Sequence, residues 1–310
     1  MEKLRKSILF IVLFLVAQYL VGSLIIPVNT PSLTREFMEV VSHADVLYFG
    51  DSVIRTTSAS DTERKPIFTY LQKGTSKLKI AGLTHDGFDS QIFYEYVKAV
   101  SKKEKKPSLI IFPINLRSFS DTWSYDFLDQ KTYLSHMDTV LFPYMTFVEN
   151  FVTPVFPQSY GFKGETVDYG DYKQQLQNVI KARKSTHDKE QSDRIAAYYL
   201  YTLTKNHKNL HALKESVKVL KESNVSVLFY ITPIDYEEGR EHYNNDFDKT
   251  VRSNIKTVKE ALGGEGVVIL DLSYRLPSSS FAWQGIGYIN EHLNDHGRKF
   301  VAKEIARNIK

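Results

Sequence analysis

Five short apolar stretches separated by helical patterns limit the fold of this chain more than any other feature of its sequence. The stretches are VLYFG at 46–50, KLKIAGL at 77–83, SLIIFPIN at 108–115, VSVLFYI at 225–231 and GVVIL at 266–270. Apolar runs of this length are typical of strands that are buried on both faces, as in a parallel sheet covered by helices. The sequence therefore predicts an α/β protein with a parallel sheet between two helical layers.

Helical patterns fill the gaps between these strands. They lie at 32–45, near 61–73, around 92–100, at 245–262 and at 295–309. Residues 116–222 interrupt the alternation with an aromatic-rich stretch, which is followed by a polar helical stretch from residue 190 onward. We expect this segment to be an insertion after the third strand that carries a lid or a partner surface.

An uncharged run at residues 7–28 follows three cations within the first six residues. The run is as long as a helix that spans a bilayer, which needs about 20 apolar residues. A cleaved signal peptide would have a shorter apolar core and small residues at the cleavage position, where this chain has bulky aliphatic ones. The sequence therefore predicts an uncleaved transmembrane signal-anchor over residues 1–28. Because positive residues stay cytoplasmic, it also predicts a single-pass protein whose domain at residues 29–310 is extracytoplasmic.

The composition excludes several classes of protein. The 310 residues are 42% hydrophobic and 25% charged, as in a globular protein that can bury one large core. There is no cysteine, which excludes disulfides, thiolate metal sites and a cysteine nucleophile. The net charge is +4, of which residues 1–28 contribute half, so the charge gives no case for a nucleic-acid partner.

Small and polar residues stand at the ends of the first three strands, where an open parallel sheet places its ligand site. Ser52, in a Gly-Asp-Ser turn, follows the first strand, Gly82 the second and Asn115 the third, while His292 precedes the last helix. A serine hydroxyl needs a base to become a nucleophile, and the oxyanion formed at a carbonyl needs fixed donors. The set therefore predicts a serine esterase site, although each residue alone is also typical of a turn, a close-packed strand or a loop.

These four blocks, in this order, resemble the SGNH, or GDSL-like, hydrolase superfamily over residues 46–302. The resemblance implies a flavodoxin-like three-layer sandwich and a reaction that needs no cofactor. It implies that Ser52 is the nucleophile and His292 the base, and that Ser52, Gly82 (with Gly87 as the alternative) and Asn115 form the oxyanion hole.

The third member of the triad departs from the superfamily pattern. An aspartate usually stands three residues before the histidine, and Ile289 occupies that position here. The polar residues nearby are Asn290, Glu291 and Asp295. We take Glu291 as the candidate, and a Ser-His dyad held by a backbone carbonyl is the alternative. His296 competes for the role of base, but the HLN sequence matches the superfamily at His292.

Two pairs of histidines have the spacing of four residues that is seen in zinc sites, at 207–211 and 292–296. Neither pair has a glutamate directly after the first histidine, as a zinc peptidase requires. We therefore expect no metal at either pair.

Outward-facing members of the superfamily with a membrane anchor resemble proteins that act on cell-envelope polymers. Among these are the polysaccharide O-acetyltransferases and the D-alanylation protein of teichoic acid assembly. The stretch PINLRSFS, with Arg117 and Ser118, is similar to that group.

The resemblance implies a membrane-tethered enzyme that transfers or removes acetyl or D-alanyl groups on an envelope glycan through an acyl group on Ser52. Its expected partners are the membrane, a membrane-bound acyltransferase, and a polysaccharide or teichoic acid acceptor. The alternatives are a general extracytoplasmic esterase and a non-catalytic envelope scaffold that keeps the fold.

Overall fold

The computed structural model describes most of the chain. The described residues are 2–25, 32–57, 61–121, 167, 168, 170, 187–264, 266–282 and 291–309. The chain divides into two compact units, Met1–Glu39 with Lys131–Tyr160 and Val40–Gln130 with Gly161–Lys310. The second unit contains the sheet and every predicted site residue.

Helix α1 (Glu2–Ile25) lies in the first unit, and helix α2 (Ser32–His43) follows it in the chain. Within the part of the chain that the structure describes, no helix is both long enough and apolar enough to cross a membrane. The transmembrane anchor that the sequence predicts over residues 1–28 stays a prediction, and the end of the uncharged run lies outside the described residues.

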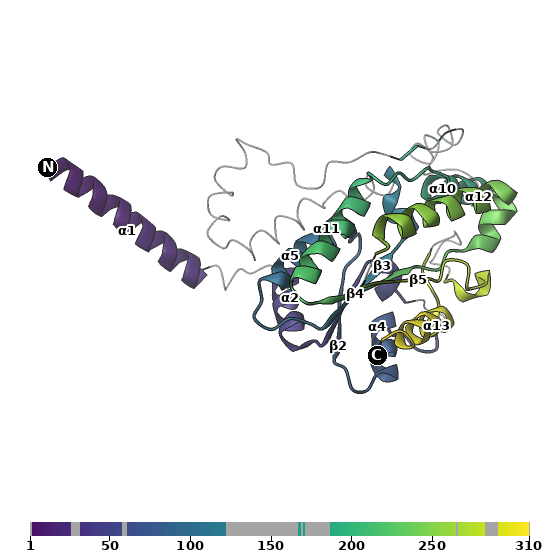
Figure 1. Cartoon of the computed structure of the whole chain (residues 1–310), viewed down its shortest axis with the longest axis horizontal. Coiled ribbons are helices and arrows are strands. Elements are labelled where there is room, and N and C mark those ends of the chain that lie inside the picture. Colours follow the sequence, from purple (N-terminus) through teal and green to yellow (C-terminus); the bar gives the residue numbers. More distant parts are fainter. Residues whose placement is uncertain are drawn as a thin grey trace. The chain divides into compact units, whose positions relative to one another are not determined.

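The second unit is built on a five-stranded parallel sheet, which confirms the α/β prediction. The strands are β1 (Val46–Gly50), β2 (Ile80–Thr84), β3 (Leu109–Ile114), β4 (Ser226–Ile231) and β5 (Val267–Asp271). They lie side by side in the order β2-β1-β3-β4-β5 (Figure 1). This is the flavodoxin-like order, in which the chain reverses its winding direction between β1 and β3.

Helices cover both faces of this sheet (Figure 1). One face carries α4 (Ile67–Gly74) and α13 (Asp295–Ala306), and the other carries α5 (Ser90–Ser101), α11 (Lys208–Glu222) and α12 (Tyr236–Leu262). The sequence predicts an insertion over residues 116–222. In the structure α11 packs on α5 as the crossover helix that leads into β4, so the end of that range belongs to the core fold. Helix α10 (His187–Tyr199) precedes it and contacts α12.

Aromatic side chains fill the core between the sheet and the α5 layer. The ring of Phe49 in β1 lies 5.2 Å from those of Phe93 and Phe112, and the Phe112 ring lies 5.2 Å from that of Phe229. The opposite face is aliphatic around a pair of tyrosines, in which the hydroxyl of Tyr48 donates to that of Tyr230 at 2.6 Å. The sheet is therefore packed on both faces, which holds the strands and their ends in place.

Gly82 allows close packing in the interior of β2. It pairs with Tyr48 of β1, two residues before the strand ends at Thr84. A Cβ added at Gly82 would lie 2.4 Å from ring atoms of Phe68, so the missing side chain gives this ring its place against the strand. Gly82 is therefore a packing residue.

We expect Gly82→Ala to lower the free energy of unfolding by about 1–3 kcal/mol, because the new methyl group must displace the ring of Phe68. The measurement is a urea titration followed by circular dichroism. Gly264→Ala is the matched control, since no atom of the described chain lies within 4 Å of a Cβ added there. Equal urea midpoints for the two variants would contradict the packing role.

Candidate functional site

Ser52 and Asn115 lie at the point where the sheet reverses its winding direction. Ser52 is the second residue after β1, and Asn115 directly follows the neighbouring strand β3. At such a point the two crossover connections leave in opposite directions, so the carboxyl ends of the strands border a crevice. The structure thus brings together two of the residues that the sequence predicts as a site.

The tight turn at residues 50–52 explains the Gly-Asp-Ser sequence. A Cβ on Gly50 would lie 2.6 Å from Cγ1 of Ile54, because the short helix α3 (Ser52–Arg55) folds back over the end of the strand. Asp51 caps this helix, and its carboxylate accepts the N–H of Val53 at 2.9 Å. Ser52 is the first residue of the helix and is partly exposed, unlike the buried Asp51.

A buried hydrogen bond joins the two strand ends. The side-chain amide of Asn115 donates to Oδ2 of Asp51 at 3.1 Å, and its oxygen accepts the N–H of Arg117 at 3.0 Å. Asp51 and Asn115 are only 3% and 4% exposed. An asparagine amide has two donors, so the second N–H of a fixed Asn115 can serve an oxyanion.

Asp51 titrates near neutrality. Burial raises its pKa to about 6, although the positive charge of Arg117 and the hydrogen bond from Asn115 favour the ionised form. The negative charge of Glu291 acts in the same direction as burial. The carboxyl group that orients the predicted oxyanion donor therefore changes charge in the range where enzymes work.

The structure separates the two candidate glycines for the oxyanion hole. Gly82 lies inside β2, where its neighbours are strand residues, and does not reach the carboxyl edge of the sheet. Gly87 is a buried residue of the turn between β2 and α5 and has a φ of +79°, which favours glycine. The N–H of His85 in the same loop donates to the carbonyl of Gly50 at 3.2 Å, so this loop contacts the Gly-Asp-Ser turn. The geometry favours the alternative, Gly87.

His292 lies in the loop that leads into α13. Its carbonyl accepts the N–H of Ala282 at 2.7 Å, and the next residue, Leu293, belongs to the same apolar cluster as Val53 of α3. Burial, together with the positive charge of Arg117, lowers the pKa of His292 to about 3. The structure shows no hydrogen bond between His292 and Ser52, although the segments that carry them pack together.

Glu291, the candidate third member of the triad, holds a different partner. One of its carboxylate oxygens lies 2.9 Å from Nε of Arg117, and the other accepts the hydroxyl of Tyr199. The side chains of Glu291 and Arg117 are 4% and 5% exposed, so this is a buried ion pair. Of the two other polar residues nearby, Asn290 lies outside the described residues, and Asp295 accepts the hydroxyl of Thr62 at 2.6 Å.

Reasoning from the sequence missed the structural role of three residues in this site. The sequence identifies Asp51 only as part of the turn, yet its carboxylate accepts a hydrogen bond from Asn115. An aspartate just before a short helix is a signal for a helix cap. Arg117 was singled out by similarity alone, and its ion pair with Glu291 spans a large separation in sequence. Tyr199 has no signal in the sequence, because only the packing of α10 brings it to Glu291.

The histidine pairs have separate surroundings. His207 is buried and caps α11, where its ring accepts the N–H of Asn209 at 3.2 Å, whereas His211 is exposed. His292 is largely buried, and His296 is exposed on α13. Among the described residues there is no group of three or more metal-ligating side chains.

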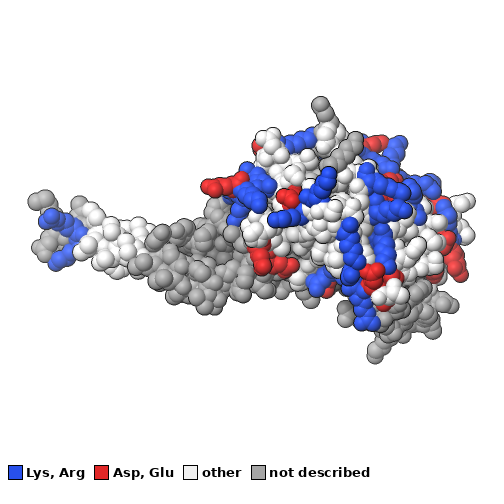
Figure 2. Space-filling model, turned by 90° about the horizontal axis from the view of Figure 1, so that it is seen from below, with Lys and Arg blue, Asp and Glu red and all other residues white. Residues whose placement is uncertain are grey.

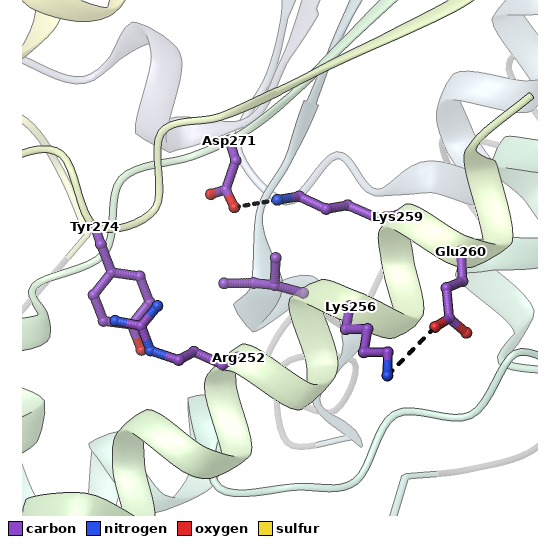
Figure 3. A pocket seen from close by; sticks show the side chains of 7 residues that line it. Arg252, Lys256, Lys259, Glu260, Asp271 and Tyr274 are labelled. Carbon is purple, nitrogen blue, oxygen red and sulfur yellow. Dashed lines mark hydrogen bonds and ion pairs between the residues drawn. The ribbon is translucent and has the colours of Figure 1, made fainter.

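A hollow of about 340 Å³ lies between α12 and the segment after β5 (Figure 3). Its lining comprises Arg252, Ile255, Lys256, Lys259, Glu260, Asp271 and Tyr274. Lys259 pairs with Asp271 at 2.6 Å, and the guanidinium of Arg252 lies 4.3 Å from the ring centre of Tyr274. The lining includes none of the predicted site residues.

The face of the molecule in Figure 2 carries basic and acidic side chains interspersed with uncharged ones. Such a mixture agrees with the small net charge of the sequence.

No protein-family model matches the chain, and neither does any curated protein. The chain is similar to several solved structures. A protein assigned to the G-D-S-L lipolytic family from Desulfitobacterium hafniense is 10% identical, with a TM-score of 0.37 over 85% of this chain and 98% of that chain. A catalytic mutant of Axe2, an acetylxylan esterase from Geobacillus stearothermophilus, is 12% identical, with a TM-score of 0.41 over 84% and 92%.

LAE5, an alpha/beta hydrolase enzyme from the metagenome of Lake Arreo, is 11% identical, with a TM-score of 0.39 over 86% of this chain and 95% of that chain. The G-D-S-L name is that of the superfamily that the sequence motifs resemble. Because all three TM-scores are below 0.5 and all three identities below 25%, these likenesses establish neither the activity nor the substrate of this chain.

The buried position of His292 makes stability depend on pH. Its pKa is about 3 in the folded protein and near the ordinary 6.5 in the unfolded chain, so the unfolded state takes up the proton first as the pH falls. His292 thus costs the folded state stability below pH 6.5. Replacing it by Gln should raise the free energy of unfolding at pH 4.5 by about 2 kcal/mol more than at pH 7.5.

Urea titrations of the wild type and His292→Gln at the two pH values measure this difference. Exposed His296→Gln is the control and should show the same small change at both. If the His292→Gln difference is independent of pH, the imidazole is not buried as the structure describes.

Proposed function

We propose that this protein is a serine acyl-ester enzyme in which Ser52 attacks the carbonyl carbon of an ester. The observation that carries the proposal is the hydrogen bond from Asn115 to Asp51, which fixes an amide donor beside the serine at the reversal point of the sheet. A turn serine needs no such arrangement on the neighbouring strand. The order of Gly-Asp-Ser, glycine, asparagine and histidine supports the same reaction by its resemblance to the SGNH superfamily.

In the proposed reaction His292 takes the proton of the Ser52 hydroxyl as its oxygen bonds to the carbonyl carbon. The negative charge on the former carbonyl oxygen is stabilised by the N–H groups of Ser52 and Gly87 and by the amide of Asn115. The imidazolium then returns its proton to the departing alcohol, which leaves an acyl group on Ser52. Water or an acceptor hydroxyl removes that group in the reverse sequence of steps.

The electrostatics around the base favour its neutral form. With its pKa lowered to about 3, His292 is unprotonated throughout the physiological range and so is able to accept a proton. The same low pKa makes it a weaker base than an ordinary imidazole. The imidazolium formed in the reaction needs a negative partner, whereas the charge that acts on His292 is the cation of Arg117.

Ser52→Ala should abolish ester hydrolysis and labelling by a fluorophosphonate probe, because the variant lacks the attacking oxygen. The free energy of unfolding should change by less than about 1 kcal/mol, since only a partly exposed hydroxyl is lost. The measurements are turnover of p-nitrophenyl acetate, gel detection of the probe and a urea titration. Ser223→Ala at the end of α11 is the matched control and should label like the wild type.

A wild-type protein that neither labels nor hydrolyses esters would contradict the proposal. So would labelling that persists in Ser52→Ala at the rate of the wild type.

We further propose the narrower function that the sequence suggests, a membrane-tethered enzyme that moves small acyl groups on an envelope glycan beside a membrane-bound acyltransferase. The support for the tether is the uncharged run at residues 7–28, together with the side chains of Ile8–Val16 in α1, which are 48–69% exposed. The support for the glycan is the resemblance around Arg117 and Ser118. The fold itself does not specify a substrate.

Cell fractionation tests the tether. We expect the full chain to sediment with membranes and to be released by detergent but not by alkaline carbonate, because apolar burial is insensitive to salt and charge. A chain that begins at residue 32 should be found in the soluble fraction. Equal distribution of the two chains would contradict the tether and leave the proposed chemistry of Ser52 untouched.

A non-catalytic scaffold is the second candidate, and one observation favours it. The charge that acts on His292 is the cation of Arg117. The carboxylate of Glu291, which the triad would need beside His292, forms an ion pair with Arg117 instead. A protein that had lost catalysis could keep such an arrangement. Probe labelling of Ser52 separates the candidates, because a scaffold has no activated serine.

A further inference from the structure

Arg298 is a completely buried charged residue in α13, the last helix of the fold. Its side chain is 0% exposed and is one of the largest fully buried side chains among the described residues. An arginine keeps its charge inside a protein, so each buried N–H of the guanidinium needs an acceptor. The identity of these acceptors shows which parts of the chain the residue holds together.

One side of the guanidinium binds the segment between α3 and α4. Nε donates to the carbonyl of Lys65 at 2.9 Å, and Nη2 donates to the carbonyl of Glu63 at 3.3 Å. Nη2 also donates to the carboxylate of Asp61 at 2.6 Å, in an ion pair whose two side chains are 0% and 1% exposed. These bonds attach α13 firmly to the chain that follows the nucleophile helix.

A single nitrogen of Arg298 joins the two halves of the proposed site. Nη1 donates to the carbonyl of Thr56 at 3.4 Å and also to the carbonyl of Leu293. Thr56 ends α3, where its N–H donates to the carbonyl of Ser52 at 2.9 Å. Leu293 directly follows His292. One atom therefore links the helix of the nucleophile to the loop of the base.

The other backbone anchors of the His292 loop lead to a different segment. The N–H of Ala282 donates to the carbonyl of His292 at 2.7 Å, and the N–H of Asn294 donates to the carbonyl of Ser280 at 3.0 Å. These bonds fix the loop against residues 280–282. Three other contacts act on its distance from α3: the bonds of Arg298, the bond of the Asp295 N–H to Asp61 at 3.0 Å, and the apolar cluster that Leu293 shares with Val53.

We propose that Arg298 is a positioning residue that sets the imidazole of His292 relative to the hydroxyl of Ser52. This inference rests on the proposed function, since it needs both groups to react. A planar guanidinium offers five donors at fixed angles, whereas a lysine offers a flexible point charge that cannot reach the same carbonyls together. A misplacement of about 1 Å in a reacting group can cost about 10²-fold in rate.

A double-mutant cycle with His292 tests the role. Arg298→Lys is made in the wild type and in His292→Ala, and kcat and KM for p-nitrophenyl acetate are measured on protein whose folded fraction is known from circular dichroism. We expect Arg298→Lys to lower kcat by about 10²-fold, with KM within about threefold of the wild type. In His292→Ala the same change should lower kcat by less than about threefold, because the group that Arg298 positions is already missing.

Arg307→Lys is the matched control. It makes the same chemical change at the end of α13, where Arg307 is 58% exposed and pairs with Glu304. It should leave kcat unchanged in both backgrounds.

Equal losses from Arg298→Lys in the two backgrounds would overturn the inference, since an effect that acts only through folding does not depend on the base. An unchanged kcat in Arg298→Lys would overturn it as well. Failure of the proposed function has a different signature: the wild type would not label at Ser52, or His292→Ala alone would leave kcat unchanged.

If Arg298→Lys does not fold, Asp61→Asn carries the same cycle. The carboxylate of Asp61 accepts from both Arg298 and Asp295, and an asparagine presents an NH₂ group to one of these two donors. We expect kcat to fall about tenfold in the wild type, since one bond of several is lost. In His292→Ala the fall should be less than about threefold, because the imidazole is already missing. No loss in the wild type, or equal losses in both backgrounds, would overturn the inference.

Discussion

The hydrogen bond between Asp51 and Asn115 connects the ends of two adjacent strands whose helical connections leave in opposite directions. Parallel pairing alone brings the two ends to one edge, because all five strands point the same way. The buried carboxylate then restricts the asparagine amide to one orientation, and the amide in turn lowers the cost of keeping that carboxylate ionised. Holding the amide in one orientation needs rigid supports, and the aromatic core around Phe49 and Phe112 provides one beneath both strand ends.

Arg117 interacts with several charged or titratable groups near His292 and not with one partner alone. Arg117 is bound by Glu291, acts on Asp51 and His292, and has its guanidinium 5.5 Å from the ring centre of Tyr198. In this buried site Arg117 acts on the pKa of both Asp51 and His292, since little water screens its charge. The imidazole therefore stays neutral, and the carboxyl of Asp51 becomes the group that titrates near pH 6. A pair of groups with pKa values moved apart is typical of catalytic sites, and ion-pair networks produce the same pattern.

All five strands could be predicted from the sequence, because long apolar runs bounded by helical patterns have few other interpretations. The ends of the strands were harder to place, and this affects which glycine lies closer to the carboxyl edge of the sheet. A predicted strand that ends at residue 83 puts Gly82 at the edge, whereas pairing with β1 extends the strand to Thr84 and moves the edge towards Gly87. The partner of Glu291 could not be predicted at all, since an ion pair to Arg117 depends on tertiary packing rather than on local sequence. Helix α3 escaped notice because four residues are too few for a periodic pattern.

The contact of Arg298 with Thr56 joins residues that are 242 positions apart in the chain. A contact between such distant residues must offset the entropy cost of closing a long loop. The turn that holds the serine, by contrast, depends on residues within a few positions of one another. A partly folded chain can therefore hold the Gly-Asp-Ser turn before the loop of His292 reaches it. If Ser52 reacts as proposed, its reactivity reports completion of the whole domain and not merely formation of the local turn.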